Sequence, residues 1–178
     1  DTSDNPATDP NLEVRYTSET HREAKRANKV SFQRKVGLEE NPDAPLFFWP
    51  SRLDPAQKGP QLLTDILYRF MSRYWKQRVQ IAVVANGVYQ QPFHDLVRYH
   101  DLYGRLAGCD FSQPLSHLGF AASDFTLVPS LFEPCGLPQM VGQIYGSLPV
   151  VHDTGGLHDT VEHFDMARFV RDEAEAEA

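Results

Sequence analysis

The sequence has few cysteines, and this shortage excludes two kinds of protein. Only two of its 178 residues are cysteine, Cys109 and Cys135, and neither has a second cysteine or a histidine at metal-ligand spacing. A disulfide framework and a zinc site of ordinary spacing are therefore excluded, and a reducing compartment is expected. We expect neither a metal ion nor a cofactor.

Positive charge and long apolar runs are also scarce. The chain has 17 lysines and arginines against 24 aspartates and glutamates, which gives a formal net charge of -7. Such a balance argues against a nucleic acid or an anionic membrane surface as a partner. No apolar run has the length needed to span a bilayer. Among partners, nucleic acid and membrane are therefore not expected.

The composition is otherwise ordinary for a globular protein, with 41% hydrophobic and 11% aromatic residues. A chain of this length forms one large domain or one lobe of something larger. We expect a connector with a polar surface helix at 1–44 and a packed Rossmann-like lobe at 45–170. The acidic end, RDEAEAEA at 171–178, is expected to be disordered.

Apolar runs typical of strands alternate with segments of helical periodicity. Strands are predicted at 45–51, 79–86, 105–109, 124–130 and 148–153, and helices at 21–35, 61–75, 91–106, 115–122, 137–147 and 157–164. Thr17 or Thr20 would cap the first helix. The predicted inner face of helix 61–75 comprises Leu62, Leu63, Ile66, Leu67, Phe70, Met71 and Trp75.

This alternation predicts an α/β fold, a Rossmann-like open parallel sheet with helices on both faces. Each strand is a nearly continuous apolar run, so we expect the strands to be buried on both faces. Crossovers should be right-handed, and ligands should gather at the carboxyl ends of the strands. The loops that follow the strands are therefore the candidates for a site.

The loop after the first predicted strand carries two cations. In SRLDPAQKG, residues 51–59, Arg52 and Lys58 flank an Asp-Pro turn, and Gly59 permits a close backbone approach. A guanidinium binds phosphate through two parallel hydrogen bonds and an ammonium adds a point charge, so the pair suits a diphosphate. The structural alternative is two solvated loop cations.

Two other loops are rich in glycine. Gly87 follows a strong predicted strand, either as a plain Asn-Gly turn or as a place where backbone packs against a nucleotide. Thr154, Gly155 and Gly156 lie between a predicted strand and a helix. Glycines that open a helix expose unpaired N–H groups, which favours an anion, while the alternative is a turn with an N-cap. The loop lacks the G-x-G-x-x-G pattern of dinucleotide-binding dehydrogenases.

The stretch FEPCGLPQ, residues 132–139, offers two chemical readings. Glu133 would accept hydrogen bonds from sugar hydroxyls, or it would complement the start of a helix. Cys135 would be a nucleophile only with a basic partner. The possible partners are His117, His152 and His158, and no spacing identifies one of them. The prolines suit a turn and the first turn of a helix.

Taken together, SRLDPAQKG, FEPCGLPQ and PVVHDTGGLHDTV resemble, in order and spacing, the bacterial glycogen synthases and plant starch synthases. These are retaining glucosyltransferases of the two-lobed GT-B type. The resemblance starts at NKVSFQ, residues 28–33, and ends near Asp165. It implies the nucleotide-sugar-binding C-terminal lobe, and transfer of glucose from ADP-glucose or UDP-glucose to the non-reducing end of an α-1,4-glucan.

The resemblance also implies roles for individual residues. Arg52 and Lys58 would bind the donor's phosphates and stabilise the leaving diphosphate, and Glu133 would hold the glucose hydroxyls. Phe111 would stack on the base. Backbone groups would reach the donor at Cys135, Gly136, Leu137, Thr154, Gly155 and Gly156. By the resemblance, Glu133, Arg52 and Lys58 are the catalytic candidates.

Four positions depart from the family pattern. Val141 stands where related transferases carry a second glutamate, which disfavours enzymes that build sucrose or trehalose phosphate. Pro138 replaces a polar residue and removes a backbone donor. Gln113 and Leu118 replace the usual glutamate and arginine of the base-stacking segment. Base preference is therefore open.

The family's K-x-G-G-L loop, acceptor groove and catalytic histidine are not found in the sequence. We therefore expect an excised donor-binding lobe that is inactive in transfer by itself, because the reaction needs two lobes closed over the donor. The alternative is a stand-alone module that binds a nucleotide sugar or a glucan without catalysis. The bacterial cytoplasm and the plastid both fit this reading.

Overall fold

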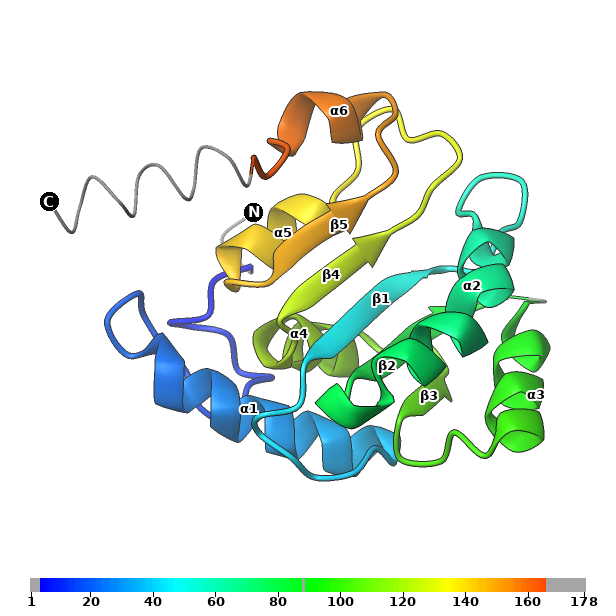
Figure 1. Cartoon of the computed structure of the whole chain (residues 1–178). Helices are drawn as coiled ribbons and strands as arrows, with labels where there is room; N and C mark the ends of the chain where they lie inside the picture. Colours follow the sequence, from blue (N-terminus) through cyan, green and yellow to red (C-terminus); the bar gives the residue numbers. More distant parts are fainter. Residues whose placement is uncertain (1–3, 88, 166–178) are drawn as a thin grey trace, which may run out of the picture.

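The structure, a computed structural model, describes residues 4–87 and 89–165 (Figure 1). The expected acidic tail at 171–178 lies outside the described residues. Five parallel strands form one sheet in the order β3-β2-β1-β4-β5. The strands are β1 Leu46–Arg52, β2 Gln80–Asn86, β3 Leu106–Cys109, β4 Phe125–Val128 and β5 Leu148–Val151. The predicted α/β class and the parallel sheet are confirmed.

Helices cover the sheet from both sides (Figure 1). They are α1 His21–Val36, α2 Pro60–Arg73, the 3-10 turn η1 Trp75–Gln77, α3 Gln90–His100, α4 Gln113–Ala122, α5 Pro138–Ile144 and α6 Gly156–Thr160. Two helices, α2 and α3, pack with one apolar cluster, while α1, α4 and α5 contribute to the other. The sheet is therefore the middle layer of three.

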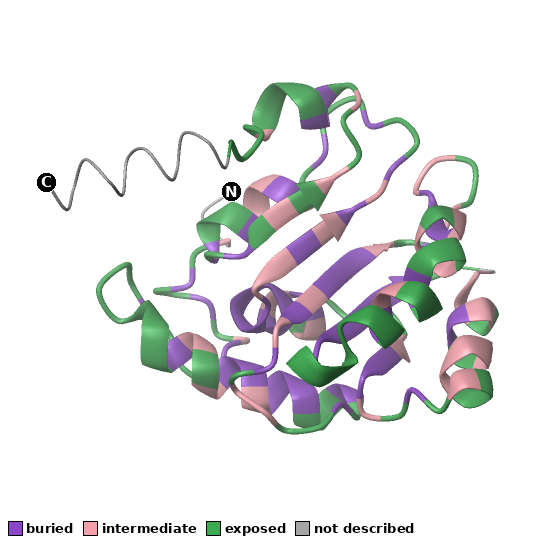
Figure 2. Ribbon diagram, viewed as in Figure 1, coloured by how far each residue is buried: buried purple, intermediate pink, exposed green. Residues whose placement is uncertain are grey.

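Strand β1 shows how one short sequence feeds both apolar clusters. Successive side chains of a strand point to opposite faces. Phe48 packs in the cluster of α1 and α4, edge-on to Phe32 and Phe120, whereas Trp49 packs against Phe93 of α3. Both side chains are at most 1% exposed. The LFFW run predicted as a buried strand is therefore buried on both faces, as Figure 2 shows for β1.

Helix α1 differs from the solvated surface helix that was expected. It spans the predicted residues and begins after Thr20, although the Thr20 side chain makes no capping hydrogen bond. Its Phe32 is fully buried, and Leu12 and Tyr16 of the preceding segment also lie in the core. Sequence periodicity missed this face because much of it is polar, and the boundary between 44 and 45 stays a prediction.

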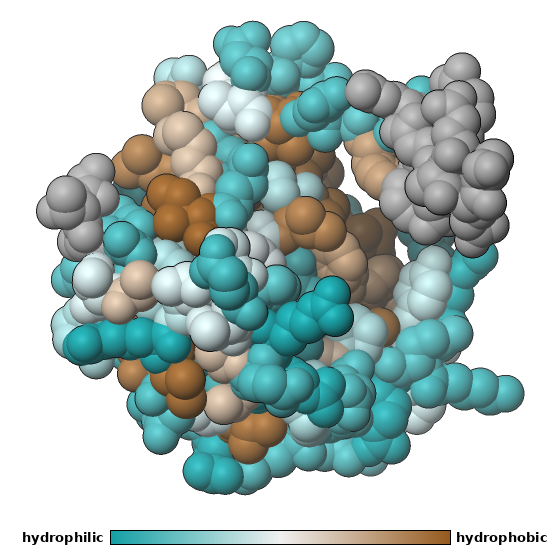
Figure 3. Space-filling model, turned by 90° about the vertical axis from the view of Figure 1, so that its left-hand side faces the viewer, coloured by the Kyte–Doolittle hydropathy of each residue, from teal (hydrophilic) through white to brown (hydrophobic). Residues whose placement is uncertain are grey.

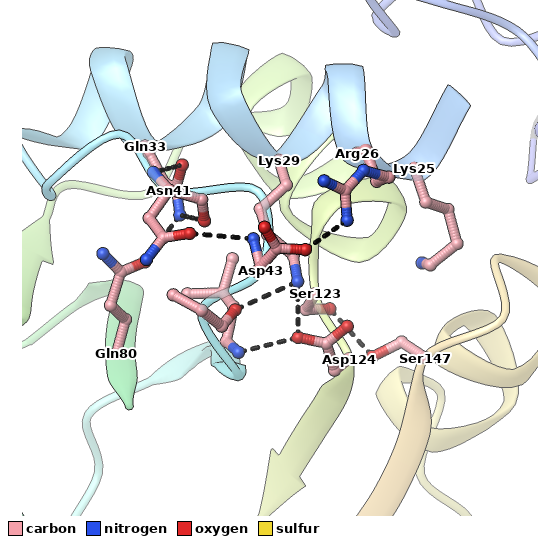
Figure 4. Close-up of polar contacts among 12 residues, drawn as sticks. Lys25, Arg26, Lys29, Gln33, Asn41, Asp43, Gln80, Ser123, Asp124 and Ser147 are labelled. Atoms are coloured by element: carbon pink, nitrogen blue, oxygen red, sulfur yellow. Dashed lines mark hydrogen bonds and ion pairs between the residues drawn. The ribbon is translucent and has the colours of Figure 1, made fainter. Parts of the chain in front are cut away.

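The polar residues of that face are tied to the ends of the strands (Figure 4). Lys29 donates to Asp124 Oδ2 at 2.7 Å and to the carbonyl oxygen of Ala44 at 3.0 Å. Gln33, fully buried, donates to the side-chain oxygen of Gln80 at 2.7 Å. These buried side chains, Lys29 and Gln33, thus have partners, which offset the cost of removing their polar groups from water. NKVSFQ therefore has a structural role here.

Three predicted helices are several residues shorter than expected. The helix predicted at 137–147 is only the seven-residue α5, Pro138–Ile144. The helix predicted at 91–106 ends at His100, because Asp101 adopts a left-handed conformation with φ 53° and its N–H caps the carbonyl of Val97. The following residues then enter β3. The helix predicted at 157–164 is only the five-residue α6.

Strand β5 and helix α2 are less buried than their sequences predicted. In β5, Leu148 is 64% and Val150 46% exposed, and in α2, Leu62 and Ile66 are 40% and 45% exposed. Only Leu67 and Met71 of the predicted α2 face are fully buried, and Trp75 is exposed. Within the described residues, β5 pairs with β4 alone and lies at the edge of the sheet. Figure 3, seen from the β5 side, shows brown apolar surface there.

None of the described helices combines the length and the apolar character that a membrane crossing requires. The same residues hold no group of three or more histidine, cysteine, aspartate or glutamate side chains placed to bind a metal ion.

Candidate functional site

The order of the strands creates a switch point between β1 and β4. From β1 the chain proceeds outward to β2 and β3, and it then returns to β4 and β5 on the other side. In open α/β sheets ligands bind outside the carboxyl ends of the strands at such a point. Arg52 ends β1, and Glu133 follows β4. The loops predicted to carry chemistry therefore meet at this edge.

Lys58 and Glu133, 75 residues apart in sequence, form an ion pair at the switch point. Lys58 Nζ lies 2.5 Å from Glu133 Oε2, and their side chains are only 16% and 8% exposed. Ser130 Oγ donates to the same carboxylate oxygen at 3.1 Å. The loops are also joined by their backbones, because Leu131 N–H donates to the carbonyl oxygen of Gln57 at 2.8 Å. A carboxylate with two donors on one oxygen is held in a defined orientation.

A cavity of about 580 Å³ opens at the same edge. Arg52, Asn86, Phe111, His117 and Leu137 are among its lining residues. This volume is within the roughly 300–1,000 Å³ typical of small-molecule sites. Phe111 is 51% exposed, so this residue is accessible to a ligand. Of the residues predicted for the donor, Arg52, Phe111 and Leu137 thus share one cavity.

Backbone segments approach very closely where the loop after β4 meets the start of α6. A Cβ atom built on Gly156 would lie 2.6 Å from both the Cα and the carbonyl oxygen of Cys135. Gly155 has φ 50°, and a Cβ there would collide with the carbonyl oxygen of Glu133. Only glycine fits both positions. The two glycines therefore allow the start of α6 to pack directly on the loop that carries Glu133 and Cys135.

The expectation that both glycines expose unpaired N–H groups is wrong for Gly156. Its N–H donates to the carbonyl oxygen of Glu133 at 2.8 Å. The N–H groups of Leu157 and His158 donate to Thr154 and Gly155. The close loop contact, which sequence periodicity does not report, therefore uses the Gly156 donor, and the turn that begins α6 uses the other two. A role of Thr154 and Gly155 in binding stays a prediction.

Pro138 lies in the first turn of α5. The first N–H groups of a helix have no partner within the helix, so proline costs no hydrogen bond there. Glu133 precedes α5 by five residues and pairs with Lys58, so it does not complement that helix start. Gly136 adopts φ 77° and turns the chain between the two.

The histidines considered as partners of Cys135 have other partners. His117 Nδ1 lies 2.7 Å from Asp9, and His152 Nδ1 lies 2.8 Å from the carbonyl oxygen of Ser130. His158 Nδ1 lies 2.7 Å from Asp153, whose hydrogen bond raises the pKa of His158. A nucleophilic thiol has no support in this geometry.

Gly87 is exposed, and its backbone lies close to that of the loop after β1. A Cβ atom on Gly87 would lie 3.0 Å from the carbonyl oxygen of Leu53. Gly87 therefore allows the turn after β2 to pack on the loop that follows Arg52. Its predicted contact with a nucleotide stays a prediction.

Sequence reasoning missed three polar residues of this edge. Asn86 Oδ1 accepts the N–H of Phe111 at 2.8 Å and so fixes the segment that carries the ring. Ser130 holds Glu133, and Ser116 lines the cavity with a buried hydroxyl that has no partner among the described residues. From the sequence, Asn86 is expected only as part of an Asn-Gly turn. Nothing in the spacing identifies the two serines.

Comparison with known proteins reveals close sequence relatives, although no family model matches the chain. A glycogen synthase of Geobacillus stearothermophilus is 40% identical over 164 residues, which cover 90% of this chain and 32% of the relative. Soluble starch synthase 3 of Solanum tuberosum, chloroplastic/amyloplastic, is 42% identical over 90% of this chain and 13% of its own length. The chain spans about a third of the length of the bacterial relatives.

Solved structures agree with this likeness. The catalytic domain of starch synthase IV from Arabidopsis thaliana, bound to ADP and acarbose, superposes with a TM-score of 0.80 at 31% identity. The match covers 92% of this chain and 33% of that one. Anabaena HepE in complex with UDP-glucose, at 23% identity and a TM-score of 0.61, shares the fold.

Proposed function

We propose, from the homology of this chain with glycogen synthases and starch synthases over 90% of its length, that it is the donor-binding lobe of such an enzyme. Its ligand would be a nucleotide sugar, ADP-glucose or UDP-glucose. The observation that carries the proposal is the buried Lys58–Glu133 pair at the switch point. A cavity lined by Arg52 and Phe111 opens at the same edge.

Each group has a chemical task in this proposal. Arg52 and Lys58 bind the diphosphate, and they stabilise the negative charge that develops on it as the glucose leaves. One Lys58 proton is used by Glu133, and an ammonium has two more to donate. Glu133 accepts hydrogen bonds from glucose hydroxyls, and Phe111 stacks on the base. Backbone groups of Cys135, Gly136 and Thr154 complete the pocket.

The whole enzyme would transfer glucose with retention to the non-reducing end of an α-1,4-glucan. This chain by itself would not transfer, because the reaction requires a second lobe to close over the donor. Relatives include bacterial enzymes and chloroplastic/amyloplastic ones, so we propose a bacterial cytoplasmic or a plastid location.

Calorimetric titration with ADP, UDP and their glucosides tests the site. Arg52→Ala is expected to weaken diphosphate binding about tenfold, the value of one charge-assisted hydrogen bond. The matched control is Arg98→Ala, an exposed arginine of α3 that pairs with Asp95. Equal affinity of Arg52→Ala and the unsubstituted chain would contradict the assignment.

A second measurement separates a binding lobe from a complete enzyme. Radiolabelled ADP-glucose or UDP-glucose is incubated with glycogen and the chain, and no label is expected in the polymer. Incorporation by the chain alone would refute the donor-lobe proposal.

A further inference from the structure

Glu133 is held asymmetrically. Both of its donors, Lys58 Nζ at 2.5 Å and Ser130 Oγ at 3.1 Å, bind the same oxygen, Oε2. Among the described residues no donor binds Oε1. The side chain is 8% exposed, so solvent reaches little of it. The two carboxylate oxygens therefore have different tasks: one is fixed by the protein, and the other is available.

Ser130 itself is firmly placed. It is 1% exposed and lies two residues after β4, which ends at Val128. Its carbonyl oxygen is bound by His152 Nδ1 at 2.8 Å, and the next residue, Leu131, is bonded to the loop that carries Lys58. A buried hydroxyl on a fixed backbone orients its acceptor more strictly than Lys58, whose long side chain is flexible.

We propose that Ser130 is a positioning residue for the glucosyl group of the donor. Its hydroxyl, together with Lys58, holds Oε2 so that Oε1 of Glu133 accepts hydrogen bonds from the glucose hydroxyls. Ser130 touches neither the diphosphate nor the base in this arrangement. Ser130 therefore determines how much more tightly a nucleoside diphosphate glucose binds than the nucleoside diphosphate alone. This inference rests on the proposed donor site.

The test is calorimetric titration of the chain with ADP and with ADP-glucose, repeated with UDP and UDP-glucose. Ser130→Ala is expected to lower the affinity for the better-bound glucoside about tenfold, as expected for a hydrogen bond to a charged group, and to leave the affinity for the diphosphate within about twofold. In a Glu133→Gln background the same serine substitution should have no further effect on the ratio of the two affinities. A purely structural serine would not produce this dependence on Glu133.

Two further variants separate positioning from packing. Ser130→Cys keeps the volume but replaces the hydroxyl by a weak donor, so it should behave like Ser130→Ala. Ser123→Ala is the matched control, because Ser123 is also a buried β4-flanking serine whose hydroxyl is bonded, to Ser147 at 2.8 Å. It should leave the affinity ratio unchanged.

Two results would overturn the inference. One is an unchanged ratio of the two affinities in Ser130→Ala, which includes equal losses for diphosphate and glucoside, and the other is full recovery in Ser130→Cys. A normal diphosphate affinity with an unchanged ratio would reject the role of Ser130 and leave the donor site standing. Absence of all nucleotide binding by the unsubstituted chain would reject both.

Discussion

Lys29 shows how a single cation joins three segments of this protein. Its Nζ binds Asp124 at 2.7 Å and the carbonyl oxygen of Ala44 at 3.0 Å (Figure 4). The same Asp124 oxygen accepts the N–H of Leu46 at 2.8 Å. Helix α1 and the starts of β1 and β4 are thus held at one carboxylate. Removing a member of such a pair strands the other charge, which costs more than the pair itself contributes.

We expect Lys29→Ala to lower the free energy of unfolding by about 2 kcal/mol, a value reduced from that of a fully buried pair because Asp124 is partly exposed. The control is Arg34→Ala, also on α1, whose pair with Glu40 is exposed to solvent and should contribute much less to stability. Urea unfolding measures both. Equal losses would show that burial of Lys29 is not the deciding factor.

At the scale of elements, the site depends on the contact of a loop with a helix. The loop after β4 and the start of α6 touch through backbone atoms, with Gly156 against Cys135. The buried Gln139 side chain of α5 joins the same parts, because it donates to the carbonyl oxygen of Cys135 at 3.0 Å and to Thr160 of α6 at 3.1 Å. The position of Glu133 is therefore coupled to α6.

Gly156→Ala is expected to push α6 from the loop, because the atoms that its Cβ meets are backbone atoms and cannot rotate away. Binding of ADP-glucose or UDP-glucose should fall about tenfold or more, with the helix content retained. Gly37→Ala is the control: its φ of 78° costs about 1 kcal/mol, but its Cβ would meet nothing within 4 Å. Calorimetry and circular dichroism are the measurements. Unchanged binding in Gly156→Ala would contradict the coupling.

At the scale of the whole molecule, Asp9 joins the N-terminal segment to α4 and to the end of α5. Its Oδ2 accepts the hydroxyl of Tyr145 at 2.6 Å and lies 2.7 Å from His117 Nδ1. Burial by itself raises the pKa of the Asp9 carboxyl, but the bonds from Tyr145, Asn11 and His117 outweigh burial and lower it below the ordinary 3.8. The folded state therefore favours the ionised carboxylate.

A lowered pKa contributes stability that is present at neutral pH and lost as the pH falls through the folded-state value. We expect Asp9→Asn to be less stable by about 1–2 kcal/mol at pH 7. The difference from the unsubstituted chain should shrink only below pH 3.8, the ordinary value. Urea unfolding at a series of pH values measures it. A difference that is constant down to pH 2 would show that Asp9 acts through packing alone.

The strand and helix segments were largely predictable because burial on both faces leaves continuous apolar runs, as in LFFW of β1. Predictions failed where tertiary contacts outweigh periodicity. Helix α1 looked solvated because its buried face carries Asn28, Lys29 and Gln33, which are satisfied only by partners far along the chain. In α2, Leu62 and Ile66 fit the helical period and are nevertheless exposed.

The sequence by itself determined the order of the elements, the parallel sheet and the edge at which the loops gather. Those properties follow from local periodicity and from chirality. Only the tertiary structure decided that Lys58 pairs with Glu133, that Ser130 shares the same carboxylate oxygen and that Gly156 uses its N–H within the protein. These contacts join residues of neighbouring strands and loops, and their distances depend on packing that no local pattern encodes.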